Sequence, residues 1–182
     1  MVQYLELFKT IRRRRSIRAF KGEPVKREDL TRVLKAAVLA PSAGDIQPWE
    51  FIVTTDAEVR RDLAVAAVGQ YWMEEAPLII TVCAKEEASA LHYGERGSRL
   101  YCIQDTAAAI QNILLASTAL GYGSCWVGAF DEGEVRRVLK IPNGVRPVAM
   151  IPIGGPGERP EARSRRSLKR VVHSEVYGGQ RF

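Results

Sequence analysis

RLYCIQDTAAAIQNILLASTAL, residues 99–120, is the stretch of this 182-residue chain that says most about its architecture. As a helix it would carry apolar residues on nearly every side, and not along a single stripe. A helix of about 22 residues is roughly 33 Å long. All-round apolarity indicates burial on every side, which a domain of this size has difficulty providing alone. We therefore expect a second subunit to pack against this helix.

Shorter elements surround this helix on both sides in the sequence. Apolar residues at helical spacing, together with capping residues, predict further helices over residues 2–14, 30–38, 56–68 and 131–139. Runs rich in β-branched and aromatic residues predict strands over residues 50–54, 76–84, 124–127 and 146–153, with a short extended piece at 17–20.

The pattern changes at Gly154-Gly155-Pro156-Gly157, a cluster of residues that usually interrupt regular structure. We expect one domain over residues 1–182, with 154–182 as an extended C-terminal arm. Leu168, Val171, Val172 and Tyr177 are too apolar for a purely solvated segment, so the arm is expected to lie along another surface.

Composition excludes several classes of protein. No apolar run approaches the roughly 20 residues of a membrane helix, and the polar, amphipathic start predicts no signal peptide, so a cytoplasmic protein is expected. The three cysteines are isolated within apolar runs and the two histidines are far apart, which disfavours a disulfide framework or a metal site.

The formal net charge of +6 comes largely from residues 12–21 and 159–170. Three interpretations remain open: a solvated face, a nucleic-acid patch, or a pocket for a phosphorylated small molecule. Composition alone favours the solvated face.

The first motif is Arg14-Arg15-Ser16-Ile17-Arg18, where the first helix ends. Its guanidiniums and hydroxyl could give a phosphate several charge-assisted hydrogen bonds. In isolation, however, a basic pentapeptide is more often a solvated surface.

The second motif is APSAGDIQPW, residues 40–49. Its small residues would let the backbone approach a flat ring closely, and Ser42, Asp45 and Gln47 supply polar side chains. A plain turn between two prolines is an equally good interpretation.

The third motif is GYGSCWVGAF, residues 121–130. A strand follows its glycines and does not precede them, so it differs from the dinucleotide-binding pattern Gly-x-Gly-x-x-Gly.

Taken together and in this order, the three motifs resemble the FMN-dependent nitroreductase family, and the resemblance extends through the arginine-rich tail. It implies an α+β fold with a central, mostly antiparallel sheet flanked by helices. It also implies an intertwined homodimer in which the C-terminal tail extends onto the partner.

The resemblance assigns a role to each motif. The residues implied to hold the FMN phosphate and ribityl are Arg14, Arg15, Ser16, Arg18, Arg163 and Arg165. The loop implied to cover the isoalloxazine from the other subunit contributes Pro41, Ser42, Ala43, Asp45 and Gln47. Gly128, with Ala129 beside it, is implied to present a backbone N–H to flavin N5, and Gln70 is a weaker candidate for a ring contact.

Asp45 departs from the family pattern, which usually has Asn at this position. An ionised carboxylate accepts hydrogen bonds but donates none, and it would repel a reduced, anionic flavin unless it were paired or protonated. Flavin affinity and potential are therefore expected to differ from those of the usual family member.

The implied mechanism is ping-pong: NAD(P)H gives a hydride to flavin N5 and leaves, and a small acceptor such as a nitroaromatic or quinone then takes the electrons. Residues 84–99 should form part of the cavity wall, and a proton could come from water, Tyr93 or Tyr101. One alternative is a family member that reduces enones, removes halide or degrades flavin. A basic nucleic-acid-binding protein is the alternative from another class.

Overall fold

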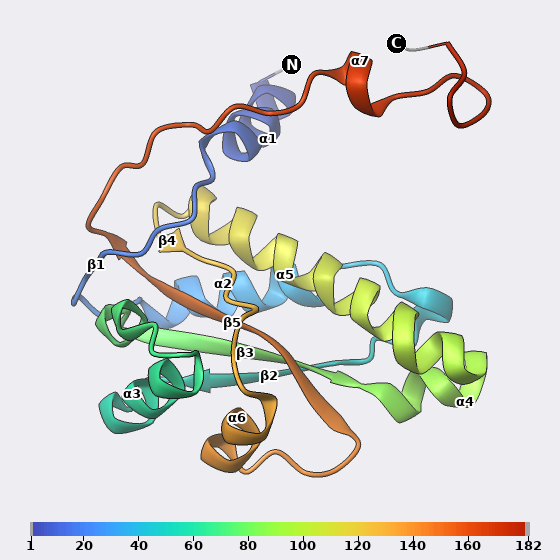
Figure 1. The fold of residues 1–182 in the computed structure, drawn as a ribbon. Coiled ribbons are helices and arrows are strands. Elements are labelled where there is room, and N and C mark those ends of the chain that lie inside the picture. Colours follow the sequence, from blue (N-terminus) through green and yellow to red (C-terminus); the bar gives the residue numbers. More distant parts are fainter. Residues whose placement is uncertain (1, 181–182) are drawn as a thin grey trace.

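The computed structural model describes residues 2–180, and its centre is an antiparallel sheet (Figure 1). The strands run in the order β1-β5-β3-β2, and β4 pairs with β5. Every strand pair is antiparallel, which confirms the predicted type of sheet. The strand bounds are β1 Phe20–Lys21, β2 Trp49–Thr54, β3 Leu78–Lys85, β4 Gly123–Ser124 and β5 Val145–Pro156.

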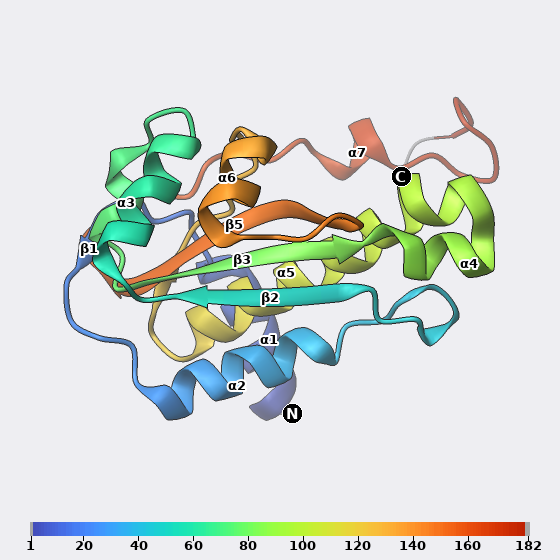
Figure 2. The same cartoon turned by 90° about the horizontal axis from the view of Figure 1, so that it is seen from below.

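Helices cover both faces of the sheet (Figure 2). Helices α2 (Arg27–Val38) and α5 (Cys102–Ala119) pack on one face, while α3 (Ala57–Ala66) and α6 (Glu132–Leu139) pack on the other. Strand β3 is buried along almost its whole length because helices cover both of its faces. Ile80 packs in the core under α2 and α5, and Ile79 packs in the core under α3 and α6.

The remaining helical elements are short or peripheral. Their bounds are α1 Val2–Arg13, α4 Glu86–Arg96 and α7 Leu168–Val171, with the single turns η1 Ala43–Asp45, η2 Tyr71–Glu75 and η3 Gly97–Tyr101. Two predicted helix starts are confirmed by side-chain caps. Asp56 accepts hydrogen bonds from the backbone N–H groups of Glu58 and Val59, and Asp131 accepts one from Glu134.

The long helix begins later than the sequence predicted. Helix α5 starts at Cys102 and not at Arg99, because residues 97–101 form a π-helical turn. Near its C-terminal end α4 is kinked at Gly94, whose φ of 56° and ψ of −143° are not helical. Gly97 then packs so closely on α4 that a Cβ atom would lie 2.2 Å from the carbonyl oxygen of Ser89. Neither the conformation of Gly94 nor the close approach of Gly97 to α4 can be recognised from the neighbouring sequence.

The predicted strand 146–153 was too short at its C-terminal end, since β5 continues through Gly154 and Gly155 to Pro156. These residues pair with β1 and β4, so they belong to the sheet and not to the arm. A Cβ at Gly154 would lie 2.5 Å from Cδ of Pro77, so glycine here permits close packing of backbone and does not end the strand.

The predicted strand 124–127 was too long. Regular pairing stops at Ser124, and Val127 makes only an isolated bridge to Met150.

The segment after β5 extends away from the sheet on the side of the molecule that carries α1 (Figure 1). Its apolar side chains are exposed within this chain, with Leu168 61% and Tyr177 94% accessible. Within residues 2–180 no helix combines the length and apolarity that crossing a membrane would require.

Candidate functional site

Two arginine clusters from opposite ends of the chain line one cavity of about 390 Å³. The connection between α1 and β1 contributes one side, and the segment after β5 contributes the other. The lining residues are Arg14, Arg15, Ser16, Arg18, Glu158, Pro160, Glu161, Arg163 and Arg165. All six residues that were predicted to hold a phosphate therefore lie together, accompanied by two carboxylates that the sequence reasoning did not include.

Backbone pairing fixes the N-terminal side of this cavity. Ser16 forms a parallel bridge with Ser124, and the N–H of Ile17 donates to the Ser124 carbonyl at 3.0 Å. Ile17 is buried against Gly123, where a Cβ would come within 2.9 Å of the isoleucine side chain. The glycine before Ser124 is thus needed for the basic segment to reach its position.

Arg18 is held by two neighbours. Its backbone N–H donates to Oε1 of Glu158 at 2.5 Å. Its guanidinium carbon lies 5.8 Å from the centre of the Trp72 ring, which in turn stacks on Phe20. Glu158, one of the two carboxylates that line the cavity, is therefore also a structural partner of the basic segment.

The arginines of the first cluster differ in what they contact. Arg14 lines the cavity and is half-buried, whereas Arg12 is exposed and lies outside it. Arg15 also lines the cavity, but its Nη1 donates to the carbonyls of Arg12 and Arg14 at 2.6 and 2.8 Å. Arg15 therefore also satisfies carbonyls at the end of α1.

A second group of predicted residues meets beside β5. The Gln70 side-chain amide donates to the carbonyl of Ala129 at 3.1 Å and to that of Ala67 at 3.0 Å. Gly128 is exposed, and within residues 2–180 its N–H has no protein acceptor. This N–H is thus available to a ligand.

The loop Pro41–Gln47 lies at the other end of the sheet. The residue that starts β2, Trp49, pairs with Ala84 at the C-terminal end of β3, while the arginine cavity adjoins the Leu78 end. Figure 2 shows the loop beside α4, opposite β1. A single chain therefore does not bring the loop and the cavity together.

The loop has a defined conformation. Ser42 Oγ accepts a hydrogen bond from the N–H of Gln47 at 3.0 Å, and the Gln47 side chain donates to Asp45 Oδ1 at 2.9 Å. Gly44, Asp45 and Gln47 all have positive φ, between 53° and 57°. The carboxylate that departs from the family pattern thus has a hydrogen-bond donor within its own loop.

Asp105 is the residue that sequence reasoning missed. It is 7% exposed on α5, its Oδ1 accepts a hydrogen bond from the N–H of Ala43 at 3.1 Å, and its Oδ2 is buried without a partner among the described residues. Burial raises the pKa of Asp105, opposed by the bond from Ala43. The available signal was a single charged side chain within the otherwise uncharged stretch 102–110.

The two tyrosines named as proton donors are neighbours. Their rings meet edge to face at 5.1 Å, and the Tyr101 hydroxyl accepts a hydrogen bond from Arg96 Nε at 3.0 Å. The Tyr93 hydroxyl lies against Gly44, where a Cβ would approach it to 2.6 Å. Tyr93 thus contacts the loop directly.

The cysteines are all free and buried, as predicted. Burial raises the pKa of Cys83 to about 12 and also raises those of Cys102 and Cys125. These thiols therefore stay protonated near neutral pH. Within residues 2–180 no group of three or more His, Cys, Asp or Glu side chains is arranged to hold a metal ion.

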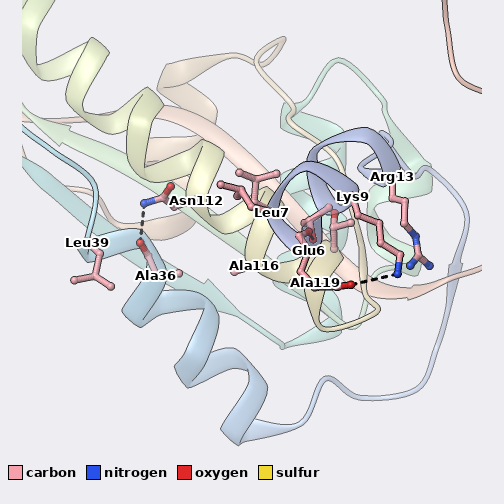
Figure 3. A pocket seen from close by; sticks show the side chains of 12 residues that line it. Glu6, Leu7, Lys9, Arg13, Ala36, Leu39, Asn112, Ala116 and Ala119 are labelled. Carbon is pink, nitrogen blue, oxygen red and sulfur yellow. Dashed lines mark hydrogen bonds and ion pairs between the residues drawn. The ribbon is translucent and has the colours of Figure 1, made fainter. Parts of the chain in front are cut away.

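A groove of about 510 Å³ runs between α1, α2 and α5 (Figure 3). Leu7, Leu39, Ala116 and Ala119 line it, and Leu7 and Leu39 are 53% and 80% exposed. Helix α5 packs on the sheet and on α2, but its side facing the groove is left open, which agrees with the expectation that this chain alone does not bury it on every side.

Known proteins resemble the chain over most of its length. The family model described as "Nitroreductase family" matches residues 11–72 and 65–155. A putative NADH dehydrogenase/NAD(P)H nitroreductase of Archaeoglobus fulgidus is 37% identical over 155 residues, which cover 83% of this chain and 86% of that protein. An FMN reductase [NAD(P)H] of Bacillus subtilis is 29% identical, over 96% of this chain and 76% of its own length.

The fold comparison agrees with the sequence comparison. The solved structure of an NADPH:FMN oxidoreductase from Vibrio harveyi, complexed with NAD+, superposes with a TM-score of 0.87 at 26% identity. The match covers 94% of this chain and 78% of that one.

Proposed function

The chain belongs to the nitroreductase family and is an NAD(P)H-dependent flavin oxidoreductase, and from this premise we propose how it works. Two copies of the chain hold FMN in shared sites. Electrons pass from NAD(P)H to a small acceptor, a nitroaromatic compound or a quinone, in a ping-pong reaction.

The convergence of the two arginine clusters on one cavity carries this proposal. Five guanidiniums and the Ser16 hydroxyl face a space of about 390 Å³, against two carboxylates. Guanidinium forks match the geometry of a phosphate and give it charge-assisted hydrogen bonds. A dianionic phosphate at the end of a flavin side chain is the group that this cavity would hold best.

The residues present fit the rest of FMN as well. Bound FMN would supply the two-electron chemistry. The free N–H of Gly128 would donate at N5, with Ala129 held beside it by Gln70. The exposed loop would cover the ring with Ser42 and Asp45.

The loop reaches this site only if it comes from a second copy of the chain. Proteins of this family are typically homodimers, and the groove between α1, α2 and α5 leaves apolar side chains such as Leu7 and Leu39 exposed. We propose that the partner covers this groove and that the exposed apolar residues of the arm, including Leu168 and Tyr177, lie on the partner. Such pairing would bury on the order of 2,000–5,000 Å².

Cofactor identity is the first test. Protein purified after growth with riboflavin, or reconstituted with flavin, should release one FMN per chain on heating, and no FAD. Protein that releases FAD, or that binds no flavin after reconstitution, would contradict the proposal.

Mixing two inactive variants tests the shared site. One carries Arg14→Ala with Arg18→Ala, and the other carries Ser42→Trp in the loop. If the loop crosses over, a heterodimer places both lesions in one site and leaves the other site wholly wild-type. Co-expression should then restore activity that neither homodimer has. A heterodimer that forms but stays inactive would mean that the loop and the arginine cavity of one chain serve the same site.

A further inference from the structure

Two polar side chains on one face of helix α5 form hydrogen bonds to the chain around the Pro41–Gln47 loop. One contacts the end of α2, just before the loop, and the other contacts the loop itself. Asn112 Nδ2 donates to the Ala36 carbonyl at 2.9 Å, and Asp105 Oδ1 accepts from the Ala43 N–H at 3.1 Å. Asp105 and Asn112 are seven residues apart, which places them two turns apart along the same side of the helix. The first bond fixes the last turn of α2, and the second fixes the start of the loop.

The loop needs such an external attachment because its backbone is strained. Asp45 and Gln47 have φ of 56° and 53°, and neither is glycine. A left-handed conformation of this kind is unfavourable for residues with a Cβ and persists where surrounding contacts enforce it. Within the loop, Ser42 Oγ and the Asp45 carboxylate each accept one hydrogen bond from Gln47.

Two contacts connect this loop to the helices beside it. The Tyr93 hydroxyl of α4 occupies the space where a side chain at Gly44 would lie. The bond from Ala43 to Asp105 is directional, and it is made to a side chain that is 7% exposed on α5. Loss of the Asp105 acceptor would leave the Ala43 N–H half-buried without this partner and free the loop from α5.

We propose that Asp105 is a positioning residue that sets the conformation of the Pro41–Gln47 loop, and thereby how tightly the loop covers the flavin of the other subunit. The inference rests on the proposed function, since it presumes that the loop contacts FMN. Asp105 does not touch the cofactor itself; it acts through Ala43.

Asp105→Leu and Asp105→Asn separate this role from simple packing. Leucine has a similar size and no acceptor, whereas asparagine keeps a carbonyl oxygen for the Ala43 N–H. FMN titrated into the apoprotein should bind Asp105→Leu roughly 2- to 12-fold more weakly, the range for loss of one hydrogen bond. Asp105→Asn should restore wild-type affinity.

Thr106→Val is the matched control. Thr106, like Asp105, is buried on α5. Its hydroxyl, however, donates to the Cys102 and Ile103 carbonyls of its own helix and does not reach the loop. The substitution should change the midpoint of denaturant unfolding and leave the FMN dissociation constant unchanged.

Ala43→Pro tests the same bond from the loop side, in case Asp105→Leu does not fold. Proline removes the N–H donor, suits the first position of a helical turn, and accepts the extended Ser42 (φ −139°, ψ 153°) before it. It should weaken FMN binding, and in a protein that already carries Asp105→Asn it should weaken it by the same factor.

The outcomes are distinguishable. If wild-type protein binds no FMN, the proposed function fails. If wild-type protein binds FMN and Asp105→Leu binds it equally well, or if Asp105→Asn is as weak as Asp105→Leu, only the positioning role of Asp105 is overturned.

Discussion

Replacing Arg14 by alanine separates specific phosphate recognition from diffuse positive charge. Arg14 lines the cavity and is half-buried, and no contact within the cavity uses its guanidinium to hold the fold. A hydrogen bond to a charged group contributes about 1.5–3 kcal/mol. The FMN dissociation constant should therefore rise about 10- to 150-fold in Arg14→Ala. The free energy of unfolding of the apoprotein should change by less than about 0.5 kcal/mol.

Two neighbouring arginines provide controls within the same run of sequence. Arg12 is exposed and outside the cavity, so Arg12→Ala should change FMN affinity less than about twofold, the scale of a weak surface charge effect. Arg15 donates to the carbonyls of Arg12 and Arg14, so Arg15→Ala should also lower the free energy of unfolding.

The assay is quenching of flavin fluorescence on titration into apoprotein at fixed ionic strength, with denaturant unfolding measured on the same preparations. Riboflavin, which lacks the phosphate, gives an internal reference because its affinity should be unaffected by Arg14→Ala. Equal losses of FMN affinity in Arg12→Ala and Arg14→Ala would refute the reasoning, since the basic run would then act only through its total charge. A parallel loss of riboflavin affinity would refute it as well.

Three further changes test other parts of the structure. Glu158→Gln keeps the acceptor for Arg18 but removes a charge from the cavity, so FMN should bind up to about fivefold more tightly by titration; weaker binding would contradict this. Gly97→Ala should lower the free energy of unfolding by about 1–3 kcal/mol in urea, because its Cβ would meet a backbone carbonyl at 2.2 Å, whereas Gly22→Ala has open space and should be neutral. Burial raises the pKa of Asp105, so the folded state binds that proton more tightly and wild-type stability falls as pH rises through the folded pKa. Asp105→Asn should match wild type in acid and exceed it at neutral pH in unfolding experiments, and the opposite trend would show that the carboxylate is stabilised by its surroundings.

The sequence predicted helices and strands well where residues within or next to the element determine its structure. The caps at Asp56 and Asp131 and the apolar run that becomes β3 determine their structure within a few positions. The errors arose where a distant segment decides the outcome. Gly154 looks like a residue that interrupts a strand, and it remains in β5 because Pro77 and β1 approach so closely that only glycine fits.

The same distinction holds for the candidate site. Arginine-rich clusters and glycine positions are visible as motifs, and the structure brings the six residues that were predicted to hold a phosphate into one cavity. Glu158 and Asp105 were missed because their importance depends on tertiary contacts, to the N–H of Arg18 and of Ala43 respectively. A carboxylate in a basic tail or in an apolar helix has no local feature that reveals such a partner.

The geometry of a single chain also supports the proposal that two subunits pair to complete the site. The arginine cavity adjoins the end of β3 at Leu78, and the loop adjoins the end at Ala84. Six residues of extended strand separate these ends by roughly 20 Å, so we propose that one FMN has its phosphate in the cavity of one chain and its ring under the loop of the other. In the homodimer that we propose, a two-fold axis brings the cavity end of one copy to the loop end of the other, and it does so twice. On this geometry each dimer has two equivalent sites or none, and any change that separates the subunits should release the flavin from both.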